Sequence, residues 1–298
     1  MPTQFMKYEK NPVMGDPSLG TCFDVYVSRE GGRYRMDFSW RPKKALAVTF
    51  SADGIHWEEP QITLSYNESS GWEDRVNRNC VLKIGEIYRM WYTGQIKGKS
   101  CIGYAESEDG IHFHRTQSTP IMVSDRPWEM PSVMNPCVLF ENGIYKMWYA
   151  AGDNYEPNVL AYAESDDGIH WKKYGTEPIF TADPNNRYEA NRVGGCQVIH
   201  TDDMGYLMFY IGYETVHKAQ ICVARSRDGI TGWERAAYNP IVVPDAESWD
   251  SDACYKPSVL WEPEQAKWML WYNGRRNDNE YVGFVSREGR RLFSPQSE

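Results

Sequence analysis

The sequence has 298 residues, of which 41% are hydrophobic, and carries a formal net charge of -9 at pH 7. This acidic balance disfavours nucleic acid as a partner, because basic surfaces bind phosphate backbones. No apolar run approaches the roughly 18 residues of a membrane span, so we expect no membrane partner.

Two further features point to a compartment. Residues 1–4 show neither the basic end nor the apolar stretch of a secretory signal. The seven cysteines include no Cys-x-x-Cys pair, and five of them fall near one phase of the repeat described below. We therefore expect buried free thiols and a cytoplasmic location, with no metal site and no cofactor.

One sequence unit recurs five times along the chain. Its marker is Ser-x-Asp-Gly-Ile-His-Trp, a hairpin signal because Asp-Gly readily adopts the positive φ of a tight turn. Copies begin at Ser51, Ser107, Ser165, Ser226 and Ser286, 56 to 61 residues apart, and the last two are degraded. A period of this length is typical of repeat architectures.

Each unit predicts four short strands. In chain order, aromatic second strands are expected over residues 34–38, 88–92, 145–149, 206–210 and 268–272. A short apolar strand precedes each of them, a third strand leads into the Asp-Gly turn, and a fourth ends in Pro-Ile. Helical periodicity is nearly absent. The pattern therefore predicts an all-β fold, a five-bladed β-propeller with four-stranded antiparallel blades, as one domain over residues 1–298.

The last unit lacks its fourth strand, and the N-terminus carries a matching piece. Phe5 and Pro12 are spaced as Trp171 and Pro178 are in the third unit. We predict that the segment from about residue 5 to residue 14 pairs into the last blade. This pairing would close the ring and remove a free sheet edge.

Five positions share one phase ahead of the aromatic strands: Asp24, Arg78, Asn135, Gly195 and Lys256. We expect each of them to begin an innermost strand and to face a common axis. Concave sites of this kind are the default location for a ligand. Charges crowded there are costly unless they are paired or used.

The motifs Pro-x-Val-x(6)-Tyr-x-Met-Trp-Tyr and Ser-x-Asp-Gly-Ile-His-Trp resemble the five-bladed glycosidases of glycoside hydrolase families 43, 32 and 68 over essentially the whole chain. The resemblance implies that Asp24, opening the first blade, acts as base or nucleophile. The second acidic residue of that clan corresponds here to Asn135. Its acid Glu corresponds to the region of Gly194 and Gly195, so neither role transfers.

A glycosidase generally needs two carboxyl groups, so neighbouring positions supply candidates for the second. Glu189, Asp252 and Glu214 are candidate proton donors, and Asp74 and Asp153 are candidate substrate-binding residues. A structural role is the alternative for Glu189, because acidic residues follow aromatic ones at equivalent places in other units. These equivalents are Glu73, Glu129 and Asp250.

Cations also gather near the inner strands. We expect substrate binding by a set that also includes the axial residues: Arg41, Arg78, Asn135, Arg192, Lys256 and Arg275. Arginine forks suit carboxylate or phosphate groups, although pairing with nearby acids is the alternative. Trp40 offers a flat face for a sugar ring, and core packing is its alternative.

The resemblance implies a glycoside hydrolase that releases a terminal sugar from a short oligosaccharide. A furanose, an acidic sugar and a phosphorylated sugar are all open as the terminal unit. Two alternatives remain. One is a glycoside phosphorylase in which the cations hold inorganic phosphate. The other is a non-catalytic carbohydrate-binding propeller, which the missing clan carboxylates at Asn135 and Gly195 favour.

Overall fold

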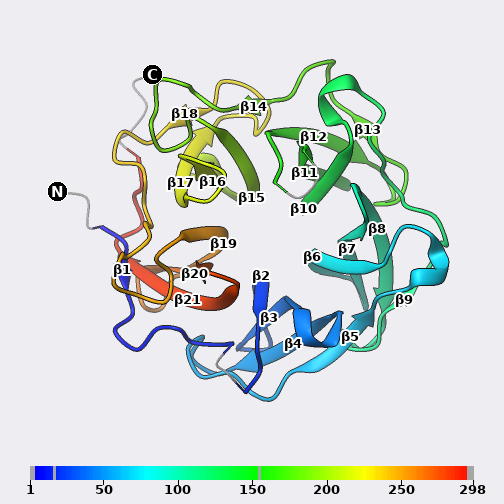
Figure 1. Cartoon of the computed structure of the whole chain (residues 1–298), viewed down its shortest axis with the longest axis horizontal. Coiled ribbons are helices and arrows are strands. Elements are labelled where there is room, and N and C mark those ends of the chain that lie inside the picture. Colours follow the sequence, from blue (N-terminus) through cyan, green and yellow to red (C-terminus); the bar gives the residue numbers. More distant parts are fainter. Residues whose placement is uncertain (1–3, 16–17, 154–155, 294–298) are drawn as a thin grey trace.

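A computed structural model describes residues 4–15, 18–153 and 156–293, and the fold is all-β. Residues 1–3, part of the stretch used above to judge export, lie outside the described residues. Figure 1 shows groups of antiparallel strands arranged around a central axis, with β2, β6, β10, β15 and β19 nearest to it. We call each group, numbered from its innermost strand, a unit.

Each unit has three long strands and a short outer one. The first and second units contain β2 (Cys22–Glu30), β3 (Arg33–Trp40), β4 (Ala45–Ser51) and β5 (Gln61–Ser65), then β6 (Arg75–Ile84), β7 (Ile87–Ile96), β8 (Lys99–Ser107) and β9 (His114–Arg115). The third contains β10 (Ser132–Glu141), β11 (Ile144–Gly152), β12 (Val159–Ser165), β13 (Lys172–Lys173) and β14 (Phe180–Thr181).

The fourth unit contains β15 (Arg192–Thr201), β16 (Gly205–Tyr213), β17 (Ala219–Ser226) and β18 (Glu234–Arg235). The fifth contains β19 (Ala253–Glu262), β20 (Lys267–Arg276), β21 (Asn279–Glu288) and β1 (Met6–Lys7). One parallel pair, Ala219 with Ala253, joins these two units into an eight-stranded sheet. The short 3-10 helices η1 (Arg41–Lys43), η2 (Glu68–Ser70) and η3 (Pro127–Glu129) lie in connections. No helix in the described part of the chain is long and apolar enough to cross a membrane.

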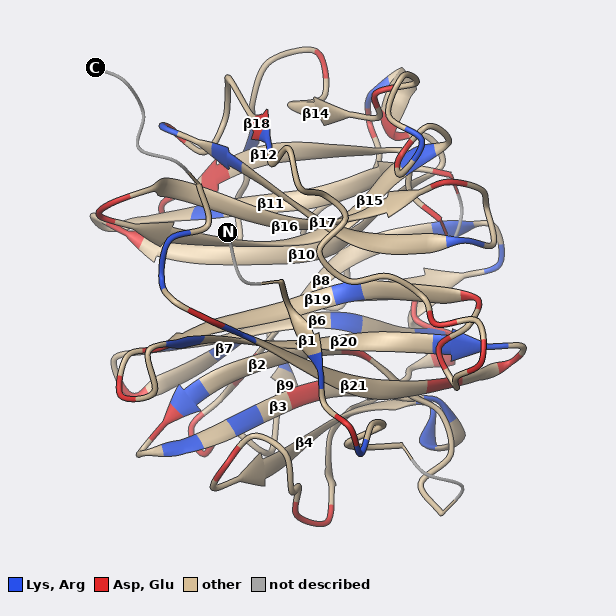
Figure 2. Ribbon diagram, turned by 90° about the vertical axis from the view of Figure 1, so that its left-hand side faces the viewer, with Lys and Arg blue, Asp and Glu red and all other residues tan. Residues whose placement is uncertain are grey.

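The N-terminal segment belongs to the last sheet, as the sequence predicted. Met6 pairs with Ser286 in an antiparallel register, and Met14 forms a further bridge with Val282. Figure 2 shows this segment alongside β21. The first strand in the chain thus completes the last unit and covers what would be an exposed sheet edge.

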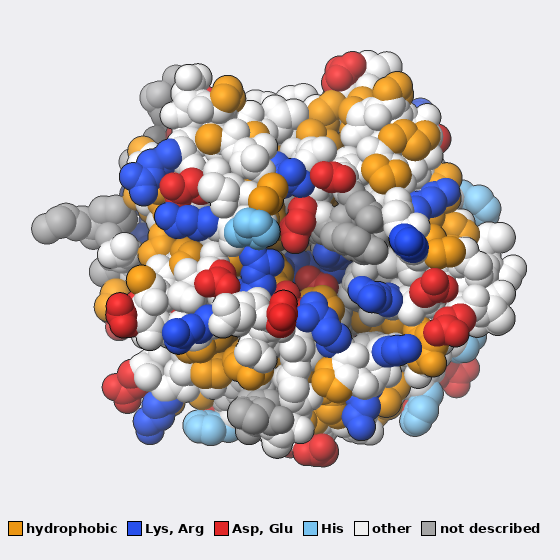
Figure 3. Space-filling view, viewed as in Figure 1, with side chains coloured by type: hydrophobic (Ala, Val, Ile, Leu, Met, Phe, Trp, Pro, Cys, Tyr) orange, Lys and Arg blue, Asp and Glu red, His pale blue; other side chains and the backbone are white. Residues whose placement is uncertain are grey.

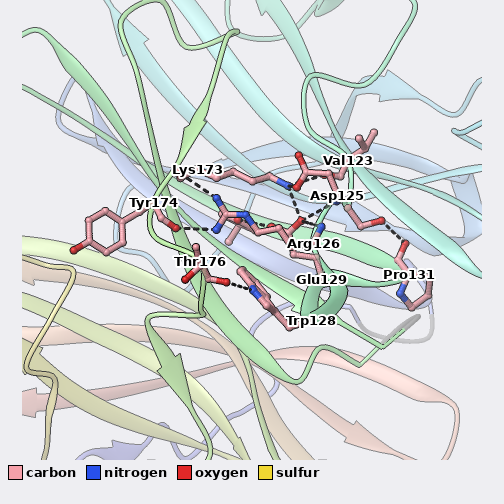
Figure 4. A network of polar contacts seen from close by, with 11 residues as sticks. Val123, Asp125, Arg126, Trp128, Glu129, Pro131, Lys173, Tyr174 and Thr176 are labelled. Atoms are coloured by element: carbon pink, nitrogen blue, oxygen red, sulfur yellow. Dashed lines mark hydrogen bonds and ion pairs between the residues drawn. The ribbon is translucent and has the colours of Figure 1, made fainter.

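A buried carboxylate recurs in four units, and each one accepts hydrogen bonds from a tyrosine and a cation. In the third unit, Glu129 accepts from the Tyr149 hydroxyl at 2.7 Å and from Lys173 Nζ at 2.6 Å. Figure 4 shows Glu129 and Lys173 within their network of polar contacts. The equivalents are Glu73 with Tyr92 and Arg115, Glu189 with Tyr210 and Arg235, and Asp250 with Tyr272 and Lys7. Since each cation lies on the outer strand of its unit, these triads fasten that strand to the core.

A belt of hydrogen bonds links the inner strands around the axis. In four units, the side chain two residues after the axial position accepts from a valine N–H of the next unit. The pairs are Cys80 with Val138 at 3.3 Å, Cys137 with Val198 at 3.2 Å, Ser258 with Val27 at 2.8 Å, and Gln197 with Val259. Tyr26 fills this place in the first unit and packs against Cys80. All seven cysteines are free and buried, which confirms the prediction of buried thiols.

Neighbouring units are also joined through the repeated turns. Trp91 Nε1 donates to the carbonyl of Gly168 at 2.8 Å, and Trp148 Nε1 donates to that of Gly229 at 2.7 Å. The turn itself is held by Asp167, whose carboxylate accepts from the backbone N–H groups of Ile169 and His170. The Ser-x-Asp-Gly motif is therefore structural, and it places a carbonyl where the preceding unit needs an acceptor.

Candidate functional site

Each innermost strand carries a β-bulge at the axial position. The register of the inner pair shifts between Phe23 and Tyr26 in the first unit, and at equivalent places in the other four. The prediction that these residues begin their strands is wrong in detail, because β2 already starts at Cys22 and the bulge follows inside the strand. A bulge re-aims its side chain and is frequent beside active sites.

Four axial residues adopt a left-handed backbone conformation. Their φ angles are 57° at Asp24, 55° at Arg78, 55° at Asn135 and 48° at Lys256. For a residue other than glycine this costs about 1–2 kcal/mol. Polar side chains of the preceding unit hold three of these bulges through the bulge N–H: Asn273 for Asp24 at 2.8 Å, Ser39 for Arg78 at 3.1 Å, and Thr93 for Asn135 at 3.1 Å. Strain of this kind is retained where it serves a site.

The fifth axial residue, Gly195, makes room for Asn135. A Cβ added at Gly195 would lie 2.7 Å from the Asn135 side-chain carbon Cγ and 2.7 Å from its Nδ2. The amide of Asn135 therefore occupies the space that a side chain at Gly195 would fill. Its Oδ1 is buried and has no hydrogen-bond partner among the described residues.

These side chains meet in a cavity of about 370 Å³ at the axis. Its lining is rich in cations, and Figure 3 shows Lys and Arg side chains gathered around a central hollow. The cations that line it are Arg41, Lys44, Arg75, Arg78, Lys256 and Arg275, and the carboxylates are Asp24, Glu156 and Glu280. In a chain with an overall charge of -9, this local excess of positive charge favours an anionic ligand.

Asp24 is the buried carboxyl group of the site. It is 3% exposed, and its Oδ2 has no hydrogen-bond partner, since Arg78 Nε lies 3.7 Å away. Burial raises the pKa of Asp24, and the charge of Glu280 adds to this effect. The positive charges of Arg78 and Lys256 oppose it. A carboxyl group with a raised pKa can hold a proton and donate it.

Lys256 is the buried ammonium of the site. The residue is 3% exposed and lines the cavity, and no hydrogen bond or ion pair to another described residue is found for its Nζ. The ammonium is therefore available to an acceptor bound in the cavity.

Two tyrosine–glutamate pairs flank the cavity. The Tyr255 hydroxyl donates to Glu280 Oε1 at 2.6 Å, and Arg41 forms an ion pair with the same carboxylate. The Tyr213 hydroxyl donates to Glu156 Oε2 at 2.7 Å. Burial, followed by the adjacent glutamate, raises the pKa of both tyrosines, so each stays a hydroxyl donor.

The structure brings together most of the substrate-binding residues predicted from sequence. Seven predicted site residues line the cavity: Asp24, Trp40, Arg41, Arg78, Asn135, Lys256 and Arg275. Trp40 also donates from Nε1 to the carbonyl of Leu19 at 2.8 Å. Their roles stay predictions, because geometry places a residue without showing what it does.

Six other predicted residues do not belong to this lining: Asp74, Asp153, Glu189, Arg192, Glu214 and Asp252. Glu189 has both oxygens engaged by Tyr210 and Arg235 in its structural triad. Asp252 accepts from the Asn277 N–H at 2.6 Å, and Glu214 pairs with Lys218 at 3.1 Å. The three candidate proton donors therefore lie outside the lining of this cavity.

Arg192 and Asp153 lie just outside the lining. They form an ion pair at 3.6 Å, and Arg192 also donates to the carbonyl of Glu156 at 2.7 Å. Arg192 therefore supports the connection that carries Glu156 to the cavity.

Sequence reasoning missed Glu156 and Glu280. Glu156 lies in the connection after the second strand of the third unit, near Asp153, and Glu280 is the second residue of β21. The sequence at these places offers no mark of which residue faces the cavity. The described residues hold no cluster of three or more His, Cys, Asp or Glu side chains suited to a metal ion.

Comparison with known proteins agrees with this architecture. The family described as "Glycosyl hydrolases family 32 N-terminal domain" matches residues 28–177 and 161–288. An uncharacterized protein of Mycobacterium tuberculosis is 28% identical over 255 residues, covering 81% of this chain and 80% of that protein. A 1,2-beta-oligomannan phosphorylase of Thermoanaerobacter sp. is 26% identical over 188 residues, covering 61% of this chain and 55% of that protein.

Two solved structures share the fold. A thermostable family-43 glycoside hydrolase matches with a TM-score of 0.73 at 18% identity, covering 97% of this chain and 99% of that one. Beta-1,2-mannobiose phosphorylase from Listeria innocua, in complex with beta-1,2-mannobiose, matches with a TM-score of 0.74 at 15% identity, covering 95% and 96%. The chain belongs to the glycosyl hydrolase family 32 N-terminal domain family, within the clan of five-bladed β-propeller glycosidases.

Proposed function

We propose that the protein cleaves a terminal glycosidic bond by phosphorolysis, with Asp24 as the proton donor and the cavity cations as the phosphate site. One observation carries this proposal. Lys256, for whose Nζ no hydrogen bond or ion pair to another described residue is found, and the protonatable carboxyl group of Asp24 line the same cavity. A proton donor and an anion site are the two parts that phosphorolysis requires.

The reaction balances without a further reactant. Asp24 gives its proton to the glycosidic oxygen as the bond from that oxygen to the anomeric carbon breaks. A phosphate oxygen forms the new bond to the anomeric carbon, which yields a sugar phosphate and an alcohol. The acidic proton of the phosphate then restores the Asp24 carboxyl group through solvent. Arg78, Lys256 and Arg41 would stabilise the charge on phosphate as it enters.

The relatives suggest the substrate to test first. A curated relative is named a 1,2-beta-oligomannan phosphorylase, and a structural relative is a beta-1,2-mannobiose phosphorylase. Short β-1,2-linked mannooligosaccharides are therefore the first candidates. The buried, unpartnered Asn135 Oδ1 supports the binding of a sugar hydroxyl, which would donate to it.

Hydrolysis, the activity first predicted from the sequence, is the second candidate. Glu156 and Glu280 favour it, since they supply further carboxylates in the cavity. In this structure each already accepts a hydrogen bond from a tyrosine, whereas the Asp24 carboxyl group accepts none from a tyrosine and has a raised pKa because of burial. A cation cluster could also hold an acidic or phosphorylated sugar. The presence of three carboxylates makes purely non-catalytic binding the weakest of these proposals.

We also propose that the five units form the blades of one closed propeller in this chain. The antiparallel order of each unit and the place of β1 in the last sheet support this arrangement.

The test is product analysis of β-1,2-mannooligosaccharides incubated with and without inorganic phosphate. Phosphorolysis predicts a sugar phosphate by ³¹P NMR and no turnover without phosphate. We expect Asp24→Asn to lower turnover at least about 10³-fold, and Lys256→Met to raise the phosphate KM. Turnover that does not depend on phosphate would establish hydrolysis. Binding without turnover of any oligosaccharide, acidic ones included, would reject both.

A further inference from the structure

We propose that Glu280 is a positioning residue for Asp24: held by Arg41 and Tyr255, it places a fixed negative charge in the cavity that the Asp24 carboxyl group also lines. The inference rests on the proposed function only in giving Asp24 the role of proton donor.

Glu280 is fixed from two sides. The side chain is nearly buried at the start of β21, and Tyr255 on β19 donates to its Oε1 at 2.6 Å. Arg41, in η1, forms an ion pair with the other oxygen. The Arg41 guanidinium also lies 4.6 Å from the ring centre of Phe23, the residue before Asp24. Three elements thus hold this carboxylate beside the strand that carries Asp24.

Four charged groups act on Asp24, and they come from four different elements. Arg78 on β6, Lys256 on β19 and Arg41 in η1 are positive, and Glu280 on β21 is negative. The uncharged Asn273 side chain binds the Asp24 N–H from β20. Three cations this close would favour the ionised carboxylate, which could not donate a proton. Burial opposes them, and so does Glu280, which also engages one of the three cations directly.

The cavity contains a natural control. Glu156 accepts from Tyr213 in the same manner as Glu280 accepts from Tyr255, at 2.7 Å and 2.6 Å. Both glutamates line the cavity, but Glu280 and Tyr255 belong to the fifth unit, which contacts the first unit that carries Asp24, whereas Glu156 and Tyr213 belong to the third and fourth units. A disturbance of the cavity as such should follow either substitution, whereas an effect on the Asp24 proton should follow only one.

The experiment is a ¹³C NMR titration of the full-length protein labelled at aspartate carboxyl carbons, with Asp24→Asn assigning the Asp24 signal. We expect Glu280→Gln to weaken proton binding by Asp24 about tenfold, that is, to lower its pKa by about one unit. Arg41→Gln should shift the same pKa upward, because it removes a cation and leaves the Glu280 charge in place. Glu156→Gln should leave it unchanged. Opposite directions for the two partners of one ion pair cannot arise from general loosening of the site.

The outcomes separate the two proposals. An Asp24 titration that is insensitive to Glu280→Gln, or equally sensitive to Glu156→Gln, overturns the positioning role whatever the enzyme catalyses. If circular dichroism shows that Glu280→Gln does not fold, the Arg41→Gln variant still tests the inference. An Asp24 pKa that is unchanged or lowered in Arg41→Gln counts against it. If the titrations give the expected shifts but the protein cleaves no glycoside, the positioning role of Glu280 stands and the proposed function is rejected. In an active enzyme, Glu280→Gln should move the alkaline limb of the kcat/KM profile to lower pH, because protonated Asp24 is the active form.

Discussion

Lys7 Nζ lies 2.5 Å from Asp250 Oδ2, although 243 residues separate the two along the chain. The equivalent cations, Arg115, Lys173 and Arg235, come from the outer strand of their own units. In the last unit, by contrast, the cation comes from the N-terminal strand, at the other end of the chain. This ion pair therefore fastens the N-terminal strand to the last unit.

We expect Lys7→Met to lower stability by about 2 kcal/mol, because it leaves the buried Asp250 carboxylate without a cation. Thermal or urea unfolding measures the effect. Lys10→Met, at a fully exposed position of the same segment, should change stability by less than about 0.5 kcal/mol. Deletion of residues 1–14 should cost more than Lys7→Met. An unchanged melting temperature after that deletion would contradict closure by the N-terminus.

Asp24→Asn should stabilise the protein at high pH while it removes activity. The folded-state pKa of Asp24 is raised by burial, so this group's contribution to stability is full below its unfolded pKa and is lost as pH rises through its folded pKa. An amide avoids that loss, and Asn tolerates positive φ better than most residues. The gain in Tm should thus be larger at pH 8 than at pH 4. Equal Tm differences at both pH values would mean that Asp24 does not titrate as inferred.

Gly195→Ala should disturb the site through Asn135. The new Cβ would lie 2.7 Å from the Asn135 amide, and such overpacking costs about 1–3 kcal/mol. Asn135→Gly removes the obstructing side chain and keeps a residue that accepts φ 55°. The double variant should therefore be more stable than Gly195→Ala alone. Strict additivity of the two changes in unfolding free energy would show that the residues do not compete for space.

Asp167→Asn should weaken the turn that links the second and third units. Hydrogen bonds from the His170 side chain and backbone hold the pKa of Asp167 below its usual range. Its stabilisation is present above the unfolded pKa, near 3.9, and is lost as pH falls toward the lower folded value. The loss of Tm on substitution should therefore be larger at pH 6 than at pH 2.5. Asp166→Asn, at an exposed neighbour, is the matched control and should change Tm less than Asp167→Asn at pH 6.

The axial residues could be predicted from the sequence, because residues at the same point of a repeated unit occupy equivalent places in the fold. Asp24, Arg78, Asn135 and Lys256 lie at one phase, and the structure brings all four to one cavity. What spacing could not show is the bulge that turns them inward. The bulge depends on side chains from the neighbouring unit, such as Asn273 for Asp24.

The second acidic group of the cavity could not be predicted from the sequence, for a related reason. Glu189 is an acidic residue, as expected of a proton donor, but its position recurs in other units. In the structure this recurring position belongs to a structural triad, here with Tyr210 and Arg235. Glu280 has no equivalent in other units and reaches the cavity only because the β20–β21 hairpin ends beside it. Side chains that do not repeat must be located by tertiary structure.

The belt of inner-strand side chains bears on how a ligand can enter the cavity. Its members are Tyr26, Cys80, Cys137, Gln197 and Ser258. These side chains are buried and joined across unit boundaries, two residues beyond the bulges. Because they are buried, we expect these side chains to close the axis on that side of the bulges. A chain-like ligand would then enter the cavity by one end only.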